Sequence, residues 1–286
     1  MGMKLNHCFL CGSSTSCIIH KGVRGGATID VLRCDKCGLV RLSEVMDEPD
    51  DFYRESGMRD GCAESLEKLR LETKDDDNRR FRFTEKMITN KRVLDFGCGD
   101  GGYLLQAKAV ASESYGVELE ASVRAALQKE GFQCYERIAE AGQMDVVTMF
   151  HVLEHLPNPV KTLQEIMDHV VPTGMLIVEV PNADDALLSL YQCKAFADFT
   201  YWKCHIYLYT MDTLRLLAKK AGLQVKFMRQ VQRYPLANHL YWLSKGQPGG
   251  HFKWSFMEND AMNHQYGELL ANLGIADTIV CGLCKE

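Results

Sequence analysis

The sequence lacks an apolar run long enough to cross a membrane, because no hydrophobic stretch reaches the roughly 18 residues that a membrane span needs. The N-terminus also lacks the charged, then apolar, then small-residue order of a secretory signal. These two absences predict a cytoplasmic protein with no membrane span.

Net positive charge is absent as well. The 286 residues hold 33 Lys and Arg against 38 Asp and Glu, a formal net charge of -5. Phosphate binding needs a basic face, so this balance disfavours a nucleic-acid partner. The remaining composition, 46% hydrophobic and 25% charged, is that of a globular protein with one large domain and additions, or two small ones.

Cysteine, in contrast, is abundant, with twelve residues. Without an export signal, metal binding or free thiols fit this count better than a disulfide framework. Two C-x-x-C pairs, Cys8 with Cys11 and Cys34 with Cys37, are each followed by glycine. Four thiolates held in two such turns suit one tetrahedral, structural zinc ion. Residues 1–45 are therefore predicted to form a zinc-binding ribbon.

Residues 46–90 have the pattern of a linker followed by a helical segment. Residues 63–88 carry apolar positions at helical spacing among many charges. The acidic run at 75–77 is expected to break this helix into two pieces. The basic-aromatic stretch at 79–83 is interpreted as a solvated face over a few core aromatics.

From residue 91 to 286, strand-like and helix-like segments alternate. The strand-like runs are RVLDFG, SYGVEL, FQCYER, MDVVTMF, MLIVEVP, LQVKFMRQV and DTIVCGL. This order predicts an α/β, Rossmann-like fold: a seven-stranded, mostly parallel sheet with helices on both faces and a ligand at the carboxyl ends of the strands. A third C-x-x-C, Cys281 with Cys284, falls in or just after the last strand and is interpreted as strand packing.

An insertion at about 232–275 separates the last two strand-like runs. A long insertion at a sheet edge is usually functional or disordered. This one is rich in Tyr, Trp, His, Asn and Gly, which suits the binding of a sugar ring or nucleotide. A dimer-forming arm is the alternative interpretation.

The stretch RVLDFGCGDGGYLL, residues 92–105, matches two nucleotide-binding patterns. Gly97, Gly99 and Gly102 spell the dinucleotide pattern G-x-G-x-x-G. With Asp95, the series Gly97, Gly99, Gly101 spells D-x-G-x-G-x-G, the pattern of enzymes that bind S-adenosylmethionine. Both cofactors need glycine here, because the loop approaches its ligand through the backbone.

Acidic residues around this loop decide between the two cofactors. Asp95 can reach the ammonium group of S-adenosylmethionine, whereas Asp95 and Asp100 would both repel a pyrophosphate. Glu118 ends the second strand, where it can hold two ribose hydroxyls in either cofactor. The acids therefore favour S-adenosylmethionine.

Over about residues 91–230 the chain resembles the class I S-adenosylmethionine-dependent methyltransferases. HVLEHL follows the fourth strand, and PTGMLIVEVPN looks like the fifth strand with its preceding turn. The resemblance implies cofactor contacts at Asp95, Gly97, Gly99, Gly101, Glu118, Leu119, Phe150 and His151. Whether Glu136, after the third strand, contacts the adenine stays open.

Methyl transfer from a sulfonium needs an aligned acceptor and, for a hydroxyl or carbon acid, a base. Histidine is the natural base near neutral pH. The candidates are His151, His155, His205 and His239. His155 adjoins Glu154 after the fourth strand, and His205 lies in an aromatic loop before the next helix.

The four-cysteine N-terminus, the core and the loop WKCHIYLYT resemble sugar C-methyltransferases of deoxysugar biosynthesis, whose loop carries a motif like YHEHFSYFS. The resemblance implies that His205 is the general base, and we predict a catalytic set of His205, His155 and Glu154. Cys204 stands where that family has glutamate, which leaves oxygen methylation open. The predicted acceptor contacts are Tyr201, Tyr207, Arg233, Tyr234, Asn238, His239, Tyr241 and His251.

The leading hypothesis is methyl transfer from S-adenosylmethionine to a small polar acceptor, most simply a nucleotide-linked sugar or a surface-glycan precursor. One alternative is an RNA base methyltransferase with a zinc module, which the acidic balance disfavours. Another is a non-catalytic cofactor-binding or partner-binding scaffold.

Overall fold

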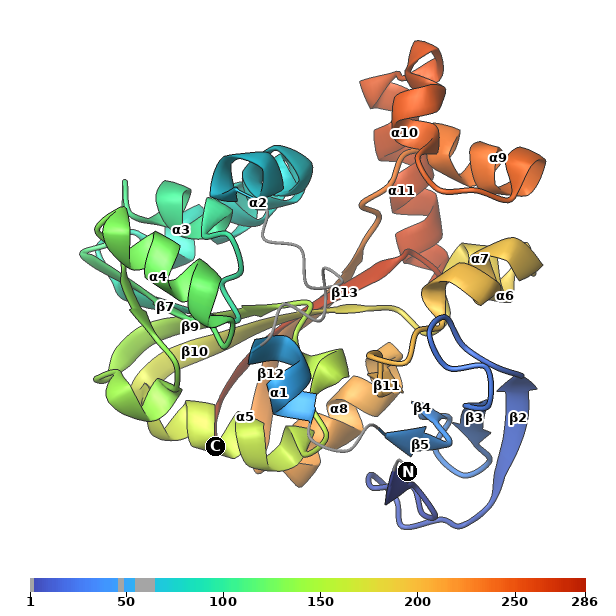
Figure 1. Cartoon of the computed structure of the whole chain (residues 1–286), viewed down its shortest axis with the longest axis horizontal. Coiled ribbons are helices and arrows are strands. Elements are labelled where there is room, and N and C mark those ends of the chain that lie inside the picture. Colours follow the sequence, from blue (N-terminus) through green and yellow to red (C-terminus); the bar gives the residue numbers. More distant parts are fainter. Residues whose placement is uncertain (1–2, 46–48, 55–64) are drawn as a thin grey trace.

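The computed structural model describes residues 3–45, 49–54 and 65–286. Figure 1 shows a small N-terminal unit rich in strands, a larger core of helices around a sheet, and a helical arm. Part of the predicted linker, residues 46–48 and 55–64, lies outside the described residues.

The core sheet has seven strands in the order β12-β13-β10-β9-β6-β7-β8. They are β6 (Arg92–Phe96), β7 (Glu113–Val117), β8 (Gln133–Tyr135), β9 (Met144–Phe150), β10 (Val170–Pro181), β12 (Leu223–Val231) and β13 (Thr278–Lys285). β13 is antiparallel to both of its neighbours, and the other pairings are parallel. The predicted Rossmann-like, mostly parallel sheet is confirmed.

Helices cover both faces of this sheet (Figure 1). One face carries α2 (Leu66–Ile88), α3 (Gly102–Ala107) and α4 (Ala121–Lys129), and the other carries α5 (Pro159–Asp168) and α8 (Met211–Lys220). Adjacent residues of a strand point to opposite faces. Accordingly, Val93 packs with Ile88 of α2 and Tyr103 of α3, whereas Leu94 belongs to the core with Leu163 of α5.

The acidic run does not break α2, which continues from Leu66 to Ile88. The expected break was wrong because two of the three acids have cationic partners: Asp76 accepts from Arg233 Nε at 2.9 Å, and Asp77 lies 3.5 Å from Arg80. The solvated-face interpretation of residues 79–83 was also wrong. Arg79 and Arg80 turn inward and both bind the buried carboxylate of Glu179 on β10.

The N-terminal unit shares a sheet with the core. Its four strands run in the order β11-β4-β3-β2, with bounds β2 (Ser16–His20), β3 (Val31–Cys34), β4 (Val40–Leu42) and β11 (Tyr207–Leu208). β11 belongs to the aromatic loop of the core, yet it pairs antiparallel with β4. β1 (Met3–Lys4) pairs separately with β5 (Glu44–Val45). The N-terminal unit is thereby attached to the loop that carries His205.

The remaining elements are mostly short. They are α1 (Pro49–Arg54), η2 (Ile138–Glu140), η3 (Leu153–His155), α6 (Ala186–Ser189), α7 (Lys194–Thr200), α9 (Leu236–Lys245), α10 (Gly250–Lys253), η4 (Ser255–Met257) and α11 (Asp260–Leu273). The last four lie between β12 and β13 and form the arm in Figure 1. Among the described residues, no helix has the length and apolar character of a membrane span.

Candidate cofactor and acceptor site

The glycine loop turns from β6 into α3 at the carboxyl edge of the sheet. Gly97, Gly99 and Gly101 all have positive φ, at 75°, 52° and 73°. A side chain at Gly97 would place its Cβ 2.5 Å from Val152 Cγ2, whereas a Cβ at Gly99 would meet nothing within 4 Å. The backbone at Gly99 therefore borders open space, as a loop that receives a ligand requires.

Glu118 is fixed beside this loop. Its Oε2 accepts a hydrogen bond from Gly99 N at 2.9 Å, and its Oε1 accepts one from Glu120 N at 2.8 Å. The next residue, Leu119, is half-buried, and its carbonyl accepts from Arg124 at 3.0 Å. Both residues directly follow β7, where Glu118 is predicted from the sequence to contact the ribose.

Asp95 is buried near the end of β6 and accepts a hydrogen bond from Thr148 Oγ1 at 2.7 Å. Burial raises the pKa of Asp95 to about 7. A cationic ligand beside this carboxyl would therefore stabilise its ionised form. Both carboxylate oxygens of Asp100 instead accept hydrogen bonds from the protein: Oδ1 from Gly102 N at 2.7 Å and Oδ2 from Thr73 Oγ1 at 3.1 Å.

Phe150, a predicted cofactor contact, and Glu136, whose contact with the adenine was left open, both have protein partners. Phe150 is 9% exposed and packs edge-on against Tyr103, with ring centroids 5.0 Å apart. Glu136, the open candidate for the adenine, lies 3.2 Å from Arg54 and 3.3 Å from Arg124. Arg54 comes from α1, so this linker helix reaches the edge of the site.

His151 adopts φ 55°, a backbone conformation that is uncommon for a residue with a side chain. The turn directs its ring between two carboxylates: Nδ1 lies 3.2 Å from Glu154 Oε1, and Nε2 lies 3.3 Å from Glu179 Oε1. Arg233 Nη1 is 2.9 Å from the same Nε2. Strain at such a turn is typical of functional sites.

The three predicted catalytic residues come together. One ligand-type atom from each of Glu154, His155 and His205 lies within 4.8 Å of the others. Glu154 and His155 belong to η3 after β9, and His205 comes from the loop before β11. The His155 and His205 rings are 5.0 Å apart. We call these three residues the Glu-His-His cluster.

Electrostatics keep Glu154 ionised and the two imidazoles of the Glu-His-His cluster neutral. Burial by itself raises the pKa of Glu154, but the hydrogen bond with His151 and the nearby imidazoles lower it to about 2. Burial lowers the pKa of His205 to about 3, with His155 adding to the effect, and burial also lowers the pKa of His155. At neutral pH the cluster therefore holds one carboxylate and two neutral imidazoles.

Sequence reasoning missed several residues that border the Glu-His-His cluster. Tyr53 of α1 places its hydroxyl 3.1 Å from His155 Nδ1, and Trp202 lies edge-on to both histidine rings. Glu179, with Arg79, closes the side next to His151. Only the aromatic composition of the loop gave a signal for Trp202, and no spacing rule connects the other three to the site.

Most of the predicted acceptor contacts lie elsewhere. Tyr201 and Tyr207 are buried against the N-terminal unit, where Tyr207 packs on Phe9. Within the arm, Asn238 bonds Gly250 N and His251, His239 bonds Tyr266, Tyr234 contacts His251, and Tyr241 contacts Trp254. Of the eight, Arg233 is linked to the Glu-His-His cluster through His151, whose ring contacts both Arg233 and Glu154.

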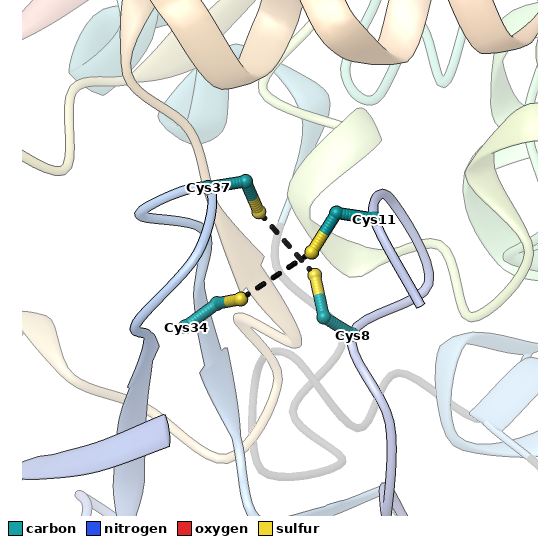
Figure 2. Close-up of side chains that lie close together, drawn as sticks. All are labelled: Cys8, Cys11, Cys34 and Cys37. Atoms are coloured by element: carbon teal, nitrogen blue, oxygen red, sulfur yellow. Dashed lines mark hydrogen bonds between the residues drawn. The ribbon is translucent and has the colours of Figure 1, made fainter. Parts of the chain in front are cut away.

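The four cysteines of the N-terminal unit converge (Figure 2). Sγ of Cys8 is 3.5 Å from that of Cys37, and Sγ of Cys11 is 3.5 Å from that of Cys34. A tetrahedral ion with metal–sulfur bonds of about 2.3 Å sets sulfurs about 3.8 Å apart. The donor set and its spacing thus fit one metal ion. Cys281 and Cys284 instead lie buried in β13.

Comparison with known proteins shows which protein family the chain resembles. A family model described as a methyltransferase domain matches residues 61–226. The ubiquinone biosynthesis O-methyltransferase of Cupriavidus pinatubonensis is 27% identical over 175 residues, which is 55% of this chain and 70% of that protein. Its counterpart from Aeromonas salmonicida is 31% identical over 172 residues, 53% of this chain and 70% of that protein.

Solved structures share the fold. A S-adenosylmethionine-dependent methyltransferase from Archaeoglobus fulgidus superposes with a TM-score of 0.50 and 20% identity over 77% of this chain and 95% of its own. A possible histamine N-methyltransferase from Thermotoga maritima gives a TM-score of 0.50 and 18% identity over 77% and 94%. Since the family match spans more than half of the sequence, the chain belongs to the methyltransferase-domain family and is an S-adenosylmethionine-dependent methyltransferase.

Proposed function

We propose that the chain methylates an oxygen of a small polar acceptor, with a nucleotide-linked sugar or surface-glycan precursor as the leading class. The Glu-His-His cluster supports this proposal, because it gathers a carboxylate and two imidazoles beyond the carboxyl end of β9. The sugar class rests on the resemblance of the ribbon and the His205 loop. The O-methyltransferase names of the relatives support oxygen as the methylated atom.

The cofactor is proposed to lie across the ends of β6, β7 and β9. Asp95 would face its ammonium group, the backbone of Gly97, Gly99 and Gly101 would pass beneath it, and Glu118 would hold the ribose. Leu119, Phe150 and His151 complete the predicted contacts. The buried Asp95 and the open space at Gly99 support this placement.

In the proposed reaction, His205 takes the acceptor proton. Its Nδ1 lies 3.3 Å from the carbonyl of Thr200, so Nδ1 carries the hydrogen and Nε2 keeps its lone pair. As the proton moves to Nε2, the acceptor oxygen bonds to the methyl carbon, the carbon–sulfur bond breaks, and neutral S-adenosylhomocysteine leaves. Glu154 would stabilise the imidazolium, and His155 would help to orient the acceptor.

Zinc at Cys8, Cys11, Cys34 and Cys37 is proposed to be structural, since four thiolates leave no position for substrate. Its effect would reach the site through β4 and β11, because Leu42 N donates to Ile206 O at 3.0 Å, one residue from His205. Metal binding would then order the loop that carries the base.

A phenolic hydroxyl is the second candidate acceptor, and the names of the ubiquinone O-methyltransferase relatives favour it. The decisive experiment incubates the protein and S-adenosylmethionine with a panel of nucleotide sugars and catechol-type phenols, read by mass spectrometry. A mass gain of one methyl on a nucleotide sugar supports the leading class, and a gain on phenols alone replaces it. Calorimetry that shows NAD binding and no S-adenosylhomocysteine binding would end the cofactor assignment.

A further inference from the structure

We infer that the Glu-His-His cluster binds a divalent first-row transition-metal ion, in addition to any ion held by the four cysteines. The inference rests on the proposed function in one respect, because both concern activation of an acceptor oxygen. In the proposed function a free His205 activates this oxygen, whereas here the bound ion does so. The observations that carry it are the convergence of the three side chains, the orientation of the two imidazoles, and a buried carboxylate oxygen without a partner.

The two imidazoles are oriented as metal ligands are. His155 Nδ1 lies 2.8 Å from the carbonyl of Cys204, and His205 Nδ1 lies 3.3 Å from the carbonyl of Thr200. A carbonyl oxygen only accepts, so each Nδ1 is the protonated nitrogen and each Nε2 presents a lone pair. Histidines that bind metals characteristically donate their second N–H to a carbonyl or carboxylate, which fixes both ring and tautomer.

Glu154 supplies the charge that such a site needs. Its side chain is 1% exposed, and Oε1 lies 3.2 Å from His151 Nδ1. Its Oε2 is buried with no hydrogen-bond partner among the described residues. An unpaired carboxylate oxygen in the interior is energetically unfavourable unless a cation or donor compensates it. An ion between Oε2 and the two Nε2 atoms would supply that compensation.

The donor set indicates the class of ion. Two imidazoles and one carboxylate suit Mn²⁺ through Zn²⁺ better than Mg²⁺ or Ca²⁺, which prefer all-oxygen sites. Three protein ligands also leave coordination positions open, in contrast to the four-thiolate cluster. Trp202 and Tyr53 form walls beside the histidines. An acceptor hydroxyl could therefore complete the coordination between these rings.

The bound ion would change how the acceptor loses its proton. Coordination lowers the pKa of a hydroxyl, so the O–H proton leaves to solvent water while the oxygen stays on the ion. That oxygen then forms the bond to the methyl carbon, and the carbon–sulfur bond breaks as before. With Nε2 of His205 on the ion, His205 acts as a ligand in this route.

Cobalt binding to the full chain tests the inference, because Co²⁺ reports its own ligands. Thiolate ligation gives intense charge-transfer bands, whereas a nitrogen–oxygen site gives weak ligand-field bands. Protein with its cysteine site filled with zinc is titrated with Co²⁺. We expect about one further equivalent to bind, with ligand-field bands alone.

Variants then assign the ion to the cluster. His205→Ala and Glu154→Gln should weaken this binding by more than about 100-fold, the upper end of the loss for a residue that only supports a ligand. His264→Ala, an exposed histidine on α11, is the matched control and should bind as the native chain does. Calorimetry with S-adenosylhomocysteine checks that each variant still folds.

Cobalt that binds only with thiolate bands, or that binds the two cluster variants as tightly as the native chain, overturns the inference. An activity arm separates this failure from failure of the proposed function. Methyl transfer that persists in the chelated enzyme without cluster metal refutes the ion's role in activating the acceptor and leaves the methyltransferase function standing. Cobalt at the cluster with no methylation of any hydroxyl acceptor refutes the proposed acceptor chemistry and leaves the metal site standing.

Discussion

Replacing Gly99 by alanine tests whether the glycine loop receives the cofactor through its backbone. The added Cβ would meet no protein atom within 4 Å, so it occupies space that the fold leaves open. The cost to the apo protein is then conformational, since φ 52° is unfavourable for alanine by about 1–2 kcal/mol. For a chain of roughly this size, each kcal/mol lowers Tm by about 2–4 °C.

Gly222→Ala is the matched control. Gly222 has φ 73° and also has nothing within 4 Å of an added Cβ. It precedes β12 at the amino edge of the parallel strands, opposite to the glycine loop. Both variants should therefore lose similar stability in thermal unfolding without cofactor.

The two variants should differ in cofactor affinity. We expect Gly99→Ala to raise the Kd of S-adenosylhomocysteine at least about tenfold, which is 1.4 kcal/mol, because the methyl group fills the space under the ligand. Gly222→Ala should leave that Kd unchanged. Equal affinities in calorimetry, with equal losses of Tm, would refute the placement of the cofactor against Gly99.

Three further predictions concern the carboxyl, the base and the cysteines. Burial raises the pKa of Asp95 to about 7, so its ionisation destabilises the fold as pH rises from about 4 through 7. Asp95→Asn should thus increase the free energy of unfolding of the apo protein at pH 8 by up to about 4 kcal/mol, and by much less at pH 5. The same variant should weaken cofactor binding. An equal gain in stability at both pH values would show that Asp95 does not ionise with a raised pKa in the fold. His205→Ala should lower kcat far more than it changes the Kd of S-adenosylhomocysteine, and near-normal turnover would remove the proposed role. Cys34→Ser should remove about one zinc per chain in elemental analysis and lower turnover through the β4–β11 pairing; unchanged metal content would refute the four-cysteine site.

The fold was predictable because its signals are local. Apolar runs of strand length, glycines at helix ends and the alternation of the two patterns were sufficient to place the sheet strands. The side chains at residues 75–83 were not interpreted correctly. A pattern of charges along one helix contains no information on Glu179 or Arg233, which pair with Arg79 and Asp76 of that helix from 100 and 157 positions away in the chain.

The site was predictable in part for the same reason. Asp95 lies near the end of β6, Glu118 directly follows β7, and the Glu154–His155 pair comes shortly after β9. The topology of a parallel sheet brings such positions to one edge. Tyr53 lies on a six-residue helix of the linker, and no periodicity connects it to His155. Asn238 and His239 look like ligand contacts in the sequence, but their polar atoms are used within the arm.

The sequence by itself determined the sheet, the glycine loop and the paired cysteines, because each depends on residues within a few positions of one another. Only the tertiary structure decided that His205 meets Glu154 and His155, and that β11 pairs with β4 of the N-terminal unit. Those contacts join segments about 50 and 167 positions apart in the chain. They depend on how the helices and strands pack against one another, and the spacing of residues along the sequence does not determine that packing.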